Sequence, residues 1–133
     1  MKKEIVDVPE MKTPLREDGT PVVPISMGVK AGDFVYVSGL PPIDRATGEM
    51  IRGDIQAQTR QSLENVKYVL ECAGSSLDKV VKVTVYCTNS GYFHQVNDIY
   101  RQYFSSEPPA RTFVTVGSWP MPFDIEIECV AIA

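Results

Sequence analysis

The pattern of apolar residues between positions 54 and 88 limits the possible folds of this chain more than any other feature. Apolar side chains recur at helical spacing from Ile55 to Ala73, with Asp54 as an N-cap residue and Gly74 as a typical helix stop. An alternating, valine-rich strand is predicted directly afterwards at 80–88. This succession predicts a helix packed on a sheet. We expect one side of the strand to carry Val81, Val83, Val85 and Cys87, and the other Val80, Lys82, Thr84 and Tyr86.

The remaining segments predict five more strands and a second helix. Ser90 is the expected N-cap of that helix, and a Glu-Pro-Pro sequence at 107–109 ends it. Its buried stripe is expected to contain Phe93, Val96, Tyr100 and Tyr103 or Phe104. The other strands are predicted at 3–8, 26–30, 33–38, 111–116 and 124–132. With 133 residues, the chain is predicted to be a single α+β domain, 1–133, with a six-stranded sheet and two helices on one face.

Two helices cover only one face of such a sheet, so the opposite face needs another explanation. That face is too apolar to remain in water as one patch and too polar for an ordinary core. We therefore expect subunits to meet sheet to sheet, with a hydrated site between them, in a homo-oligomer. The residues expected on this face are Phe34, Tyr36, Tyr86, Phe113, Val130 and Ile132, together with Ser38, Glu126 and Glu128.

Charge argues against a nucleic-acid partner. The chain has 13 Lys and Arg against 17 Asp and Glu, a formal net charge of −4, and its basic residues are spread singly. Nucleic-acid binding needs a basic stripe that neutralises phosphates. The sequence therefore predicts no nucleic-acid binding.

Metals, nucleotide cofactors and membranes are not indicated either. Three cysteines without Cys-x-x-Cys spacing and one histidine, His94, do not form a recognisable metal site, and Cys87 and Cys129 are interpreted as buried apolar residues. No glycine-rich phosphate loop is present. No stretch approaches the ~20 apolar residues of a membrane span, and no apolar run follows the basic N-terminus. We expect a cytoplasmic protein with no metal and no cofactor.

Arg111 and Glu126 are the strongest candidates for chemistry. Arg111 lies between the Pro-Pro break and a strand, where its guanidinium could bind a carboxylate through two hydrogen bonds; the alternative is a solvated surface arginine. Glu126 shares a strand face with Glu128, and a carboxylate there could position water or carry a proton. Solvent exposure or an ion pair is the alternative.

Ser38 and His94 raise the question of nucleophilic catalysis. Ser38 ends a strand and precedes Gly39, but it lies outside a Gly-x-Ser-x-Gly elbow. A Ser-His or Cys-His pair is formally possible with His94, although a helix-surface imidazole is the simpler interpretation.

Five segments together resemble one protein family. They are AGDFVYVSG at 31–39, GDIQAQTRQSLENV at 53–66, VVKVTVY at 80–86, PPART at 108–112 and IEIECVAI at 125–132. In this order and spacing, from about Pro24 to the C-terminus, they resemble the YjgF/RidA family of reactive-intermediate (enamine/imine) deaminases.

The resemblance implies a fold, an assembly and a reaction. The fold would be a chorismate-mutase-like α+β domain with a mixed sheet, assembled as a homotrimer with a central barrel and three clefts between subunits. The reaction would be cofactor-free hydrolysis of 2-aminoacrylate and related 2-imino acids to 2-keto acids and ammonia. By the same resemblance, Arg111 would hold the substrate carboxylate, Glu126 would lie near the imine carbon and its attacking water, and Ser38 and Gly39 would form the pocket wall.

Three positions depart from the family pattern. Ile25 stands where the family often has Tyr, Leu40 where it often has Gln, and Phe113 where it frequently has Cys. These changes make the pocket less polar or reshape it, so we expect a bulkier or more apolar substrate than aminoacrylate, with Trp119 as a further lining residue.

Three other functions remain as alternatives. They are a non-catalytic, small-carboxylate-binding or chaperone-like module, a dedicated aminomuconate-type catabolic deaminase, and a ribonuclease, which the acidic charge balance disfavours.

Overall fold

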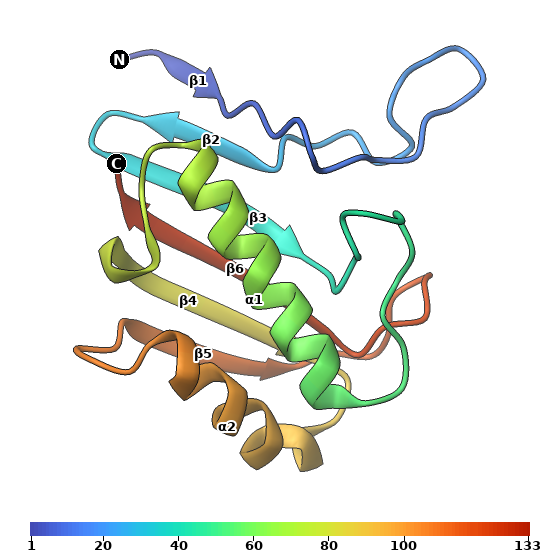
Figure 1. Ribbon diagram of the computed structural model, residues 1–133, viewed down its shortest axis with the longest axis vertical. Coiled ribbons are helices and arrows are strands. Elements are labelled where there is room, and N and C mark those ends of the chain that lie inside the picture. Colours follow the sequence, from blue (N-terminus) through green and yellow to red (C-terminus); the bar gives the residue numbers. More distant parts are fainter.

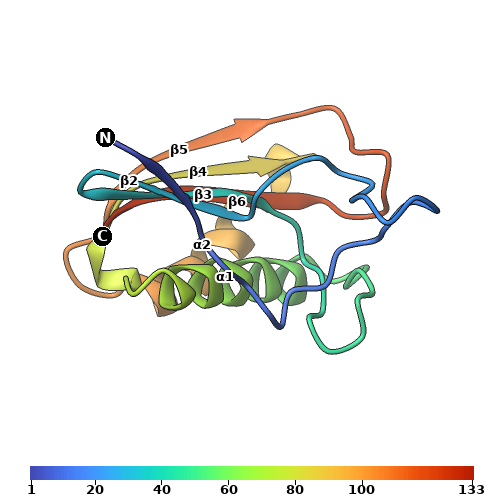
Figure 2. The same ribbon diagram turned by 90° about the horizontal axis from the view of Figure 1, so that it is seen from above.

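The computed structural model describes all 133 residues and places both helices on one face of a six-stranded sheet (Figure 1, Figure 2). The strand order is β1-β2-β3-β6-β4-β5. This confirms the predicted α+β architecture and the placement of the helices. The strands are β1 (Lys3–Ile5), β2 (Gly28–Ala31), β3 (Phe34–Leu40), β4 (Val80–Cys87), β5 (Ala110–Thr115) and β6 (Ile125–Ile132). The helices are α1 (Ile55–Cys72) and α2 (Phe93–Tyr103), with 3-10 turns η1 (Leu77–Lys79) and η2 (Ser90–Tyr92).

The sheet is mixed because one connection crosses over it. β4 and β5 are parallel neighbours joined through α2, whereas every other neighbouring pair is antiparallel. A parallel pair requires such a crossover, which accounts for the position of α2 beside α1 (Figure 1). β5 is therefore an edge strand, and β6 lies inside the sheet between β3 and β4.

The core lies between α1 and the sheet, as the helical stripe predicts. Leu63, Val66 and Leu70 of α1 are almost fully buried, and the Asp54 side chain caps the helix by accepting a hydrogen bond from the Gln56 N–H at 3.0 Å. The chain leaves the helix through Gly74, whose φ of 80° suits glycine. On the sheet side the same core contains Val35, Val37, Val83, Val85, Ile125, Ile127 and Ala131.

Two further features bear on the sequence predictions. Cys87 and Cys129 are buried free thiols, as expected, whereas Cys72 is exposed. The structure contains no helix with the length and apolar character to cross a membrane.

A bulge reverses the side of the sheet toward which the first residues of β4 point. The register with β6 shifts between Val80 and Lys82, so Val80 is buried and Val81 is 40% exposed. The prediction that Val81 joins the inner side was wrong, because the extra residue of a bulge reverses the alternation on one side of it.

Phe113 lies on the helix side of the sheet, not on the open face as predicted. β5 runs parallel to β4 with Phe113 opposite the buried Val85, and residues paired in this way point to the same side. The neighbouring Val114, opposite Tyr86, takes the place on the open face. Alternation alone distinguishes two sides of a strand but not which one the helices cover.

The start of α2 also differs from the prediction. The capping side chain is that of Asn89, which accepts from the Gly91 N–H at 2.8 Å and begins the 3-10 turn η2, so α2 begins only at Phe93. Phe93 is consequently 39% exposed, and Ile99 joins Val96 and Tyr100 in the buried stripe.

Candidate active site

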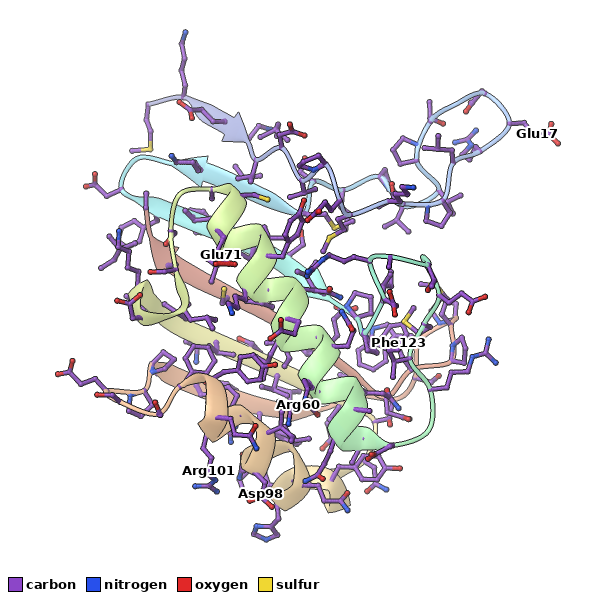
Figure 3. All side chains as sticks on the ribbon, viewed as in Figure 1. Glu17, Arg60, Glu71, Asp98, Arg101 and Phe123 are labelled. Atoms are coloured by element: carbon purple, nitrogen blue, oxygen red, sulfur yellow. The ribbon has the colours of Figure 1, made fainter.

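A cavity of about 330 Å³ opens on the sheet face that the helices leave uncovered, around Glu126. Two of the predicted site residues, Gly39 and Trp119, line it together with Glu126. The Trp119 ring stacks on Phe123, with ring centroids 4.5 Å apart, and Phe123 itself is buried between neighbouring loops (Figure 3). The remaining lining residues are Tyr86, Val116, Ser118 and Glu128.

A bulge in β3 shapes the wall of this cavity. Val37 pairs with Cys129 and Leu40 with Ile127, so the two residues Ser38 and Gly39 occupy the interval opposite one residue of β6. A Cβ atom on residue 39 would collide with the Glu126 carboxyl group. Glycine is therefore required here for close approach, because the carboxyl group packs directly over the backbone.

Buried polar side chains of α1 hold both strand ends that carry the site. Ser62 donates to the Leu40 carbonyl at 2.7 Å, and Asn65 donates to the carbonyls of Pro41 and Ile43. Gln58 receives a hydrogen bond from the Asp124 N–H at 2.8 Å and donates to the Asp124 carboxylate at 3.1 Å. These contacts fix the end of β3 and the beginning of β6 against one rigid helix.

The surroundings of Glu126 in the cavity make its carboxyl group a weaker acid. Burial, reinforced by the nearby charge of Glu128, raises the pKa of the Glu126 carboxyl above its ordinary value. The Tyr86 hydroxyl donates a hydrogen bond to Glu128, and that bond together with burial raises the pKa of Tyr86. The cavity thus holds two carboxyl groups with different surroundings, which is the usual way to separate acid and base roles.

Arg111 lies in an aromatic cage on the helix side of the sheet. Its guanidinium carbon is 4.7 Å from the ring centroid of Tyr100, 5.6 Å from that of Phe93 and 5.9 Å from that of Phe113. It takes part in neither of the two ion pairs of the chain, Arg16–Asp18 and Arg101–Asp98. The solvated-surface alternative is thereby disfavoured: this is a half-buried cation without an acidic partner, a common arrangement for binding an anion.

A cleft of about 650 Å³ adjoins Arg111 between α2 and the segment that leads into β5. Burial raises the pKa of Tyr100 in its wall to about 12, although the Arg111 charge opposes the rise. Arg101 also borders this cleft, but with Asp98 it points outward from α2 (Figure 3).

Arg111 and Glu126 do not meet within one protomer. Arg111 is opposite the buried Val83, whereas Glu126 is opposite Tyr86 of the open face. Two strand spacings and three residues separate their backbones by about 14 Å, and their side chains leave opposite faces. Either half of the candidate site is therefore incomplete by itself.

The other residues that the sequence analysis singled out line neither the Glu126 cavity nor the Arg111 cleft. Ser38 is beside Gly39, but its hydroxyl donates to the Ser26 carbonyl at 2.6 Å. It therefore links β3 to the residues just before β2. Ile25 is 49% exposed and borders a separate cavity near β1. Leu40 is fully buried in the core and contributes no side chain to a pocket, contrary to expectation, because the β3 bulge turns it inward. His94 is exposed on α2, in edge contact with Phe93.

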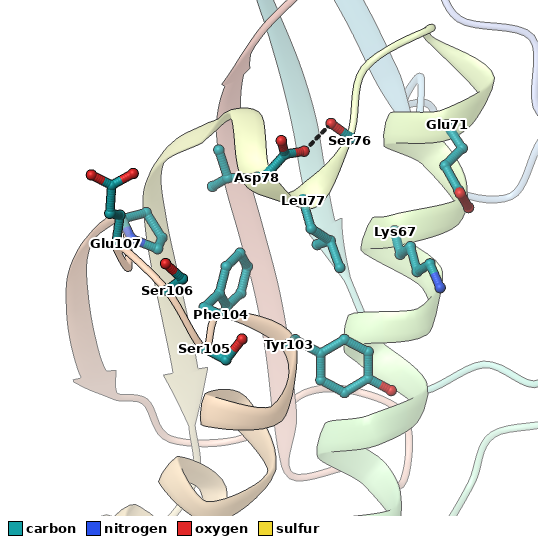
Figure 4. Close-up of a pocket in the computed structure, with 12 residues that line it drawn as sticks. Lys67, Glu71, Ser76, Leu77, Asp78, Tyr103, Phe104, Ser105, Ser106 and Glu107 are labelled. Atoms are coloured by element: carbon teal, nitrogen blue, oxygen red, sulfur yellow. Dashed lines mark hydrogen bonds between the residues drawn. The ribbon is translucent and has the colours of Figure 1, made fainter.

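Another cavity, of about 370 Å³, contains no predicted site residue. It lies between the end of α1, the turn η1 and the segment after α2 (Figure 4). Its polar groups come from side chains such as Lys67, Glu71 and Asp78, the last accepting a hydrogen bond from Ser76. No group of three or more His, Cys, Asp or Glu side chains in the structure is arranged to hold a metal ion.

Comparison with known proteins identifies the family. A sequence profile described as endoribonuclease L-PSP matches residues 17–133. A RutC family protein of Pyrococcus horikoshii is 48% identical over 111 residues, covering 84% of this chain and 88% of its own. The chain belongs to the YjgF/RidA/RutC family.

Named enzymes and solved structures of this family extend the comparison. A protein of Dermatophagoides farinae named 2-iminobutanoate/2-iminopropanoate deaminase is 34% identical over 122 residues, covering 92% of this chain and 94% of its own. A putative endoribonuclease of Thermotoga maritima has a TM-score of 0.88 at 41% identity, over 100% and 98% of the two chains. Escherichia coli TdcF, solved with bound serine, has a TM-score of 0.86 at 32% identity over 98% of each chain.

The family resemblance drew attention to Arg111 and Glu126 but not to their supports. Phe93 and Tyr100 reach Arg111 only because the crossover brings α2 over β5, and no local spacing signals this. The hydrogen bond between Tyr86 and Glu128 could likewise not be predicted from the sequence, although both residues were expected on the open face.

Proposed function

We propose that the protein hydrolyses 2-imino acids, and the enamines in equilibrium with them, to 2-keto acids and ammonia without a cofactor. In this proposal, the active sites lie between the subunits of a homotrimer. Arg111 of one subunit binds the substrate carboxylate, and Glu126 of the next handles protons at the imine. The relatives support the general class, since one is named a 2-iminobutanoate/2-iminopropanoate deaminase and another binds serine, a small amino acid.

The single observation that carries the proposal is the environment of Arg111. A half-buried guanidinium surrounded by three aromatic rings has lost much of its hydration without gaining a carboxylate. Such a group gains most from an anion that offers two oxygens in one plane. The carboxylate of a 2-imino acid has that shape, and it places the adjacent C=N carbon at a fixed distance from the clamp.

The open sheet face supports assembly. Phe34, Tyr36, Val114 and Ile132 are between 36% and 48% exposed on it, and the Glu126 cavity opens among strands of the same face. Covering this face with a second copy would remove apolar surface from water, and a contact along the edge strand β5 would bring an Arg111 side chain to a neighbouring subunit. Trimerisation around a central barrel satisfies both needs.

The chemistry requires only positioning and one proton carrier. The water oxygen bonds to the carbon of the protonated imine as the C=N π electrons move to nitrogen, and ionised Glu126 takes the water proton. Glu126 then returns this proton to nitrogen, the C–N bond breaks, and the hydroxyl proton passes to the departing ammonia as the carbonyl forms. A raised pKa makes the Glu126 carboxylate a stronger base, which favours removal of the water proton.

Aromatic side chains border both halves of the site and favour a substrate with an apolar side chain. Trp119 lines the Glu126 cavity, and Phe113 packs edge-on against Phe93 at 5.2 Å beside Arg111. A panel of imines, generated in situ from different amino acids by an amino-acid oxidase, measures this preference as ammonia release above the spontaneous rate. We expect larger apolar imines to have higher kcat/KM than the imine of alanine.

Complementation between inactive variants is the decisive experiment. Arg111→Ala and Glu126→Gln should each lose at least about 100-fold in kcat/KM, while Arg60→Ala, on the outer side of α1, should not. Arg60 donates only to Gln102. Co-expressed with different tags, the two inactive chains form mixed trimers in which one of the three clefts has both groups. Doubly tagged trimers should therefore recover about one third of wild-type activity.

The possible outcomes separate the claims. Wild-type activity in Arg111→Ala would refute the role of Arg111 as the carboxylate clamp, and a wild-type protein that accelerates the hydrolysis of no imine would refute the reaction. Two inactive variants without recovery in mixed trimers would refute the division of the site between subunits. Saturable binding of 2-keto acids without acceleration of any imine would identify a carboxylate-binding module instead.

A further inference from the structure

The hydrogen bond between Tyr86 and Glu128 has no role in the reaction as proposed so far. It lies in the wall of the Glu126 cavity, on the open face of the sheet. A surface ion pair would need no explanation, but a phenol and a carboxylate joined beside a second carboxyl group form a small network with its own proton affinity.

The sheet register places the three side chains of this network next to one another on one face. Glu126 and Glu128 are two residues apart on β6 and share one face. Tyr86 of β4 is the direct cross-strand partner of Glu126, and its long side chain reaches diagonally to Glu128. The three side chains therefore form a triangle whose third corner is the carboxyl group that packs over Gly39.

Few other charged groups approach this triangle. From β3 the cavity receives only Gly39, and from the segment after β5 it receives Val116, Ser118 and Trp119, none of which titrates. The next ionisable residue on β4, Lys82, donates to the Thr112 hydroxyl at 2.6 Å on the edge strand. Glu128 and Tyr86 are consequently the titratable neighbours that the protomer itself presents to Glu126.

We infer that Tyr86 is a positioning residue whose hydroxyl holds the Glu128 carboxylate beside Glu126, which makes Glu126 the proton carrier of the pair. This inference rests on the proposed function, since it assigns a support to the group that moves the proton there. The donated hydrogen bond fixes the direction of the carboxylate that accepts it. Burial raises the pKa of Glu126, and the negative charge so held at Glu128 adds to that rise.

The test compares two tyrosines that both donate to a glutamate. Tyr86→Phe removes the hydroxyl beside Glu126. Tyr103→Phe removes an equivalent bond to Glu64, 2.7 Å long and located between the two helices, and serves as the matched control. The readouts are carbon-13 NMR titration of labelled glutamate carboxyl groups, with Glu126→Gln and Glu128→Gln for assignment, and the pH dependence of kcat and KM on an in situ imine.

We expect Tyr86→Phe to move the Glu126 titration to lower pH. Without its donor, the Glu128 carboxylate is no longer held beside Glu126, so less negative charge opposes ionisation of Glu126. Glu128→Gln should move the titration in the same direction. In Tyr86→Phe kcat should fall roughly tenfold, a fraction of the full general acid–base contribution, with KM nearly unchanged because the Arg111 clamp is intact. Tyr103→Phe should change neither readout.

An unchanged Glu126 titration and pH profile in Tyr86→Phe would overturn the inference. If Arg111→Ala and Glu126→Gln are inactive in the same series, the proposed function survives that result. If the wild-type protein accelerates no imine, the proposed function fails, while the NMR titration still decides whether Tyr86 controls Glu126. Should Tyr86→Phe not fold, Glu128→Gln decides, because it keeps shape and acceptor and removes only the charge.

Discussion

The substitution Gly39→Ala should strongly reduce the activity of this protein while reducing its stability only slightly. The added methyl group would lie 2.8 Å from the Glu126 carboxyl carbon, whereas ordinary contacts begin near 3.4 Å. The Glu126 side chain must therefore retreat by at least several tenths of an ångström. Its carboxyl group borders a cavity of about 330 Å³, so it has space to do so without moving the backbone.

The expected effects on stability and rate differ strongly. Overpacking costs about 1–3 kcal/mol in general, but here a flexible side-chain end yields and the entropy gain of Gly→Ala returns about 0.4–1 kcal/mol. We expect a net loss of at most about 1 kcal/mol, or a Tm decrease of a few degrees. Displacing the proton carrier by an amount on the order of 1 Å should reduce kcat/KM by about 100-fold.

Urea unfolding and imine hydrolysis, measured on the same preparations, check this prediction. Gly117→Ala is the matched control. Gly117 lies between Val116 and Ser118, which line the same cavity, its φ angle is not positive, and an added methyl group would have no atom within 4 Å. Gly39→Ala with wild-type kcat/KM would refute the reasoning, since Glu126 would then tolerate displacement. A large loss of stability would show that the backbone, not the carboxyl group, gives way.

Two further predictions concern stability. Because the pKa of Glu126 is raised on folding, the folded state binds more protons than the unfolded state between the ordinary and the raised pKa, so this group makes stability decrease as pH rises through that window. Glu126→Gln should remove this component of the pH dependence and be more stable than wild type at neutral pH in urea titrations; equal slopes would contradict the assignment. Gln58→Leu should destabilise by about 1–3 kcal/mol, because it leaves the Asp124 N–H without its acceptor, with calorimetry as the measurement and Gln56→Leu, which removes only an exposed hydrogen bond to the Gln95 carbonyl, as control.

The layers of the fold were predictable from the sequence because each layer has a local cause. The stripe from Ile55 to Ala73 has one period, and the valines of β4 have another, so the element types and the buried stripe of α1 follow from neighbouring residues alone. The same reasoning identified an uncovered sheet face bearing aromatic residues such as Phe34 and Tyr36.

The bulges in β3 and β4 could not be predicted in this way. Each inserts a residue that reverses the alternation beyond it, and nothing in the local composition at Val80 or Ser38 marks the insertion. Their consequences are large for the site. The β3 bulge places Gly39 beneath the Glu126 carboxyl group, and without it the family resemblance could name both residues but not explain why they need each other.

The facing of β5 illustrates a different limit. Its alternation is clear, but its direction depends on the crossover through α2, which decides whether Arg111 or Thr112 faces the helices. The residue type and position of Arg111 therefore made it a candidate anion site, while its aromatic cage of Phe93 and Tyr100 required the tertiary structure.

The three positions that depart from the family pattern should affect the choice of substrate to different degrees. Leu40 is buried in the core, and its carbonyl accepts from Ser62, so it changes the packing beneath the site and not the pocket surface. Ile25 borders a cavity near β1, away from both halves of the site in the protomer. Only Phe113 lies in direct contact with the anion clamp. Substrate size should therefore respond to Phe113 far more than to Leu40: Phe113→Cys should shift the imine preference toward small side chains, whereas a shift produced by Leu40→Gln alone would contradict this placement.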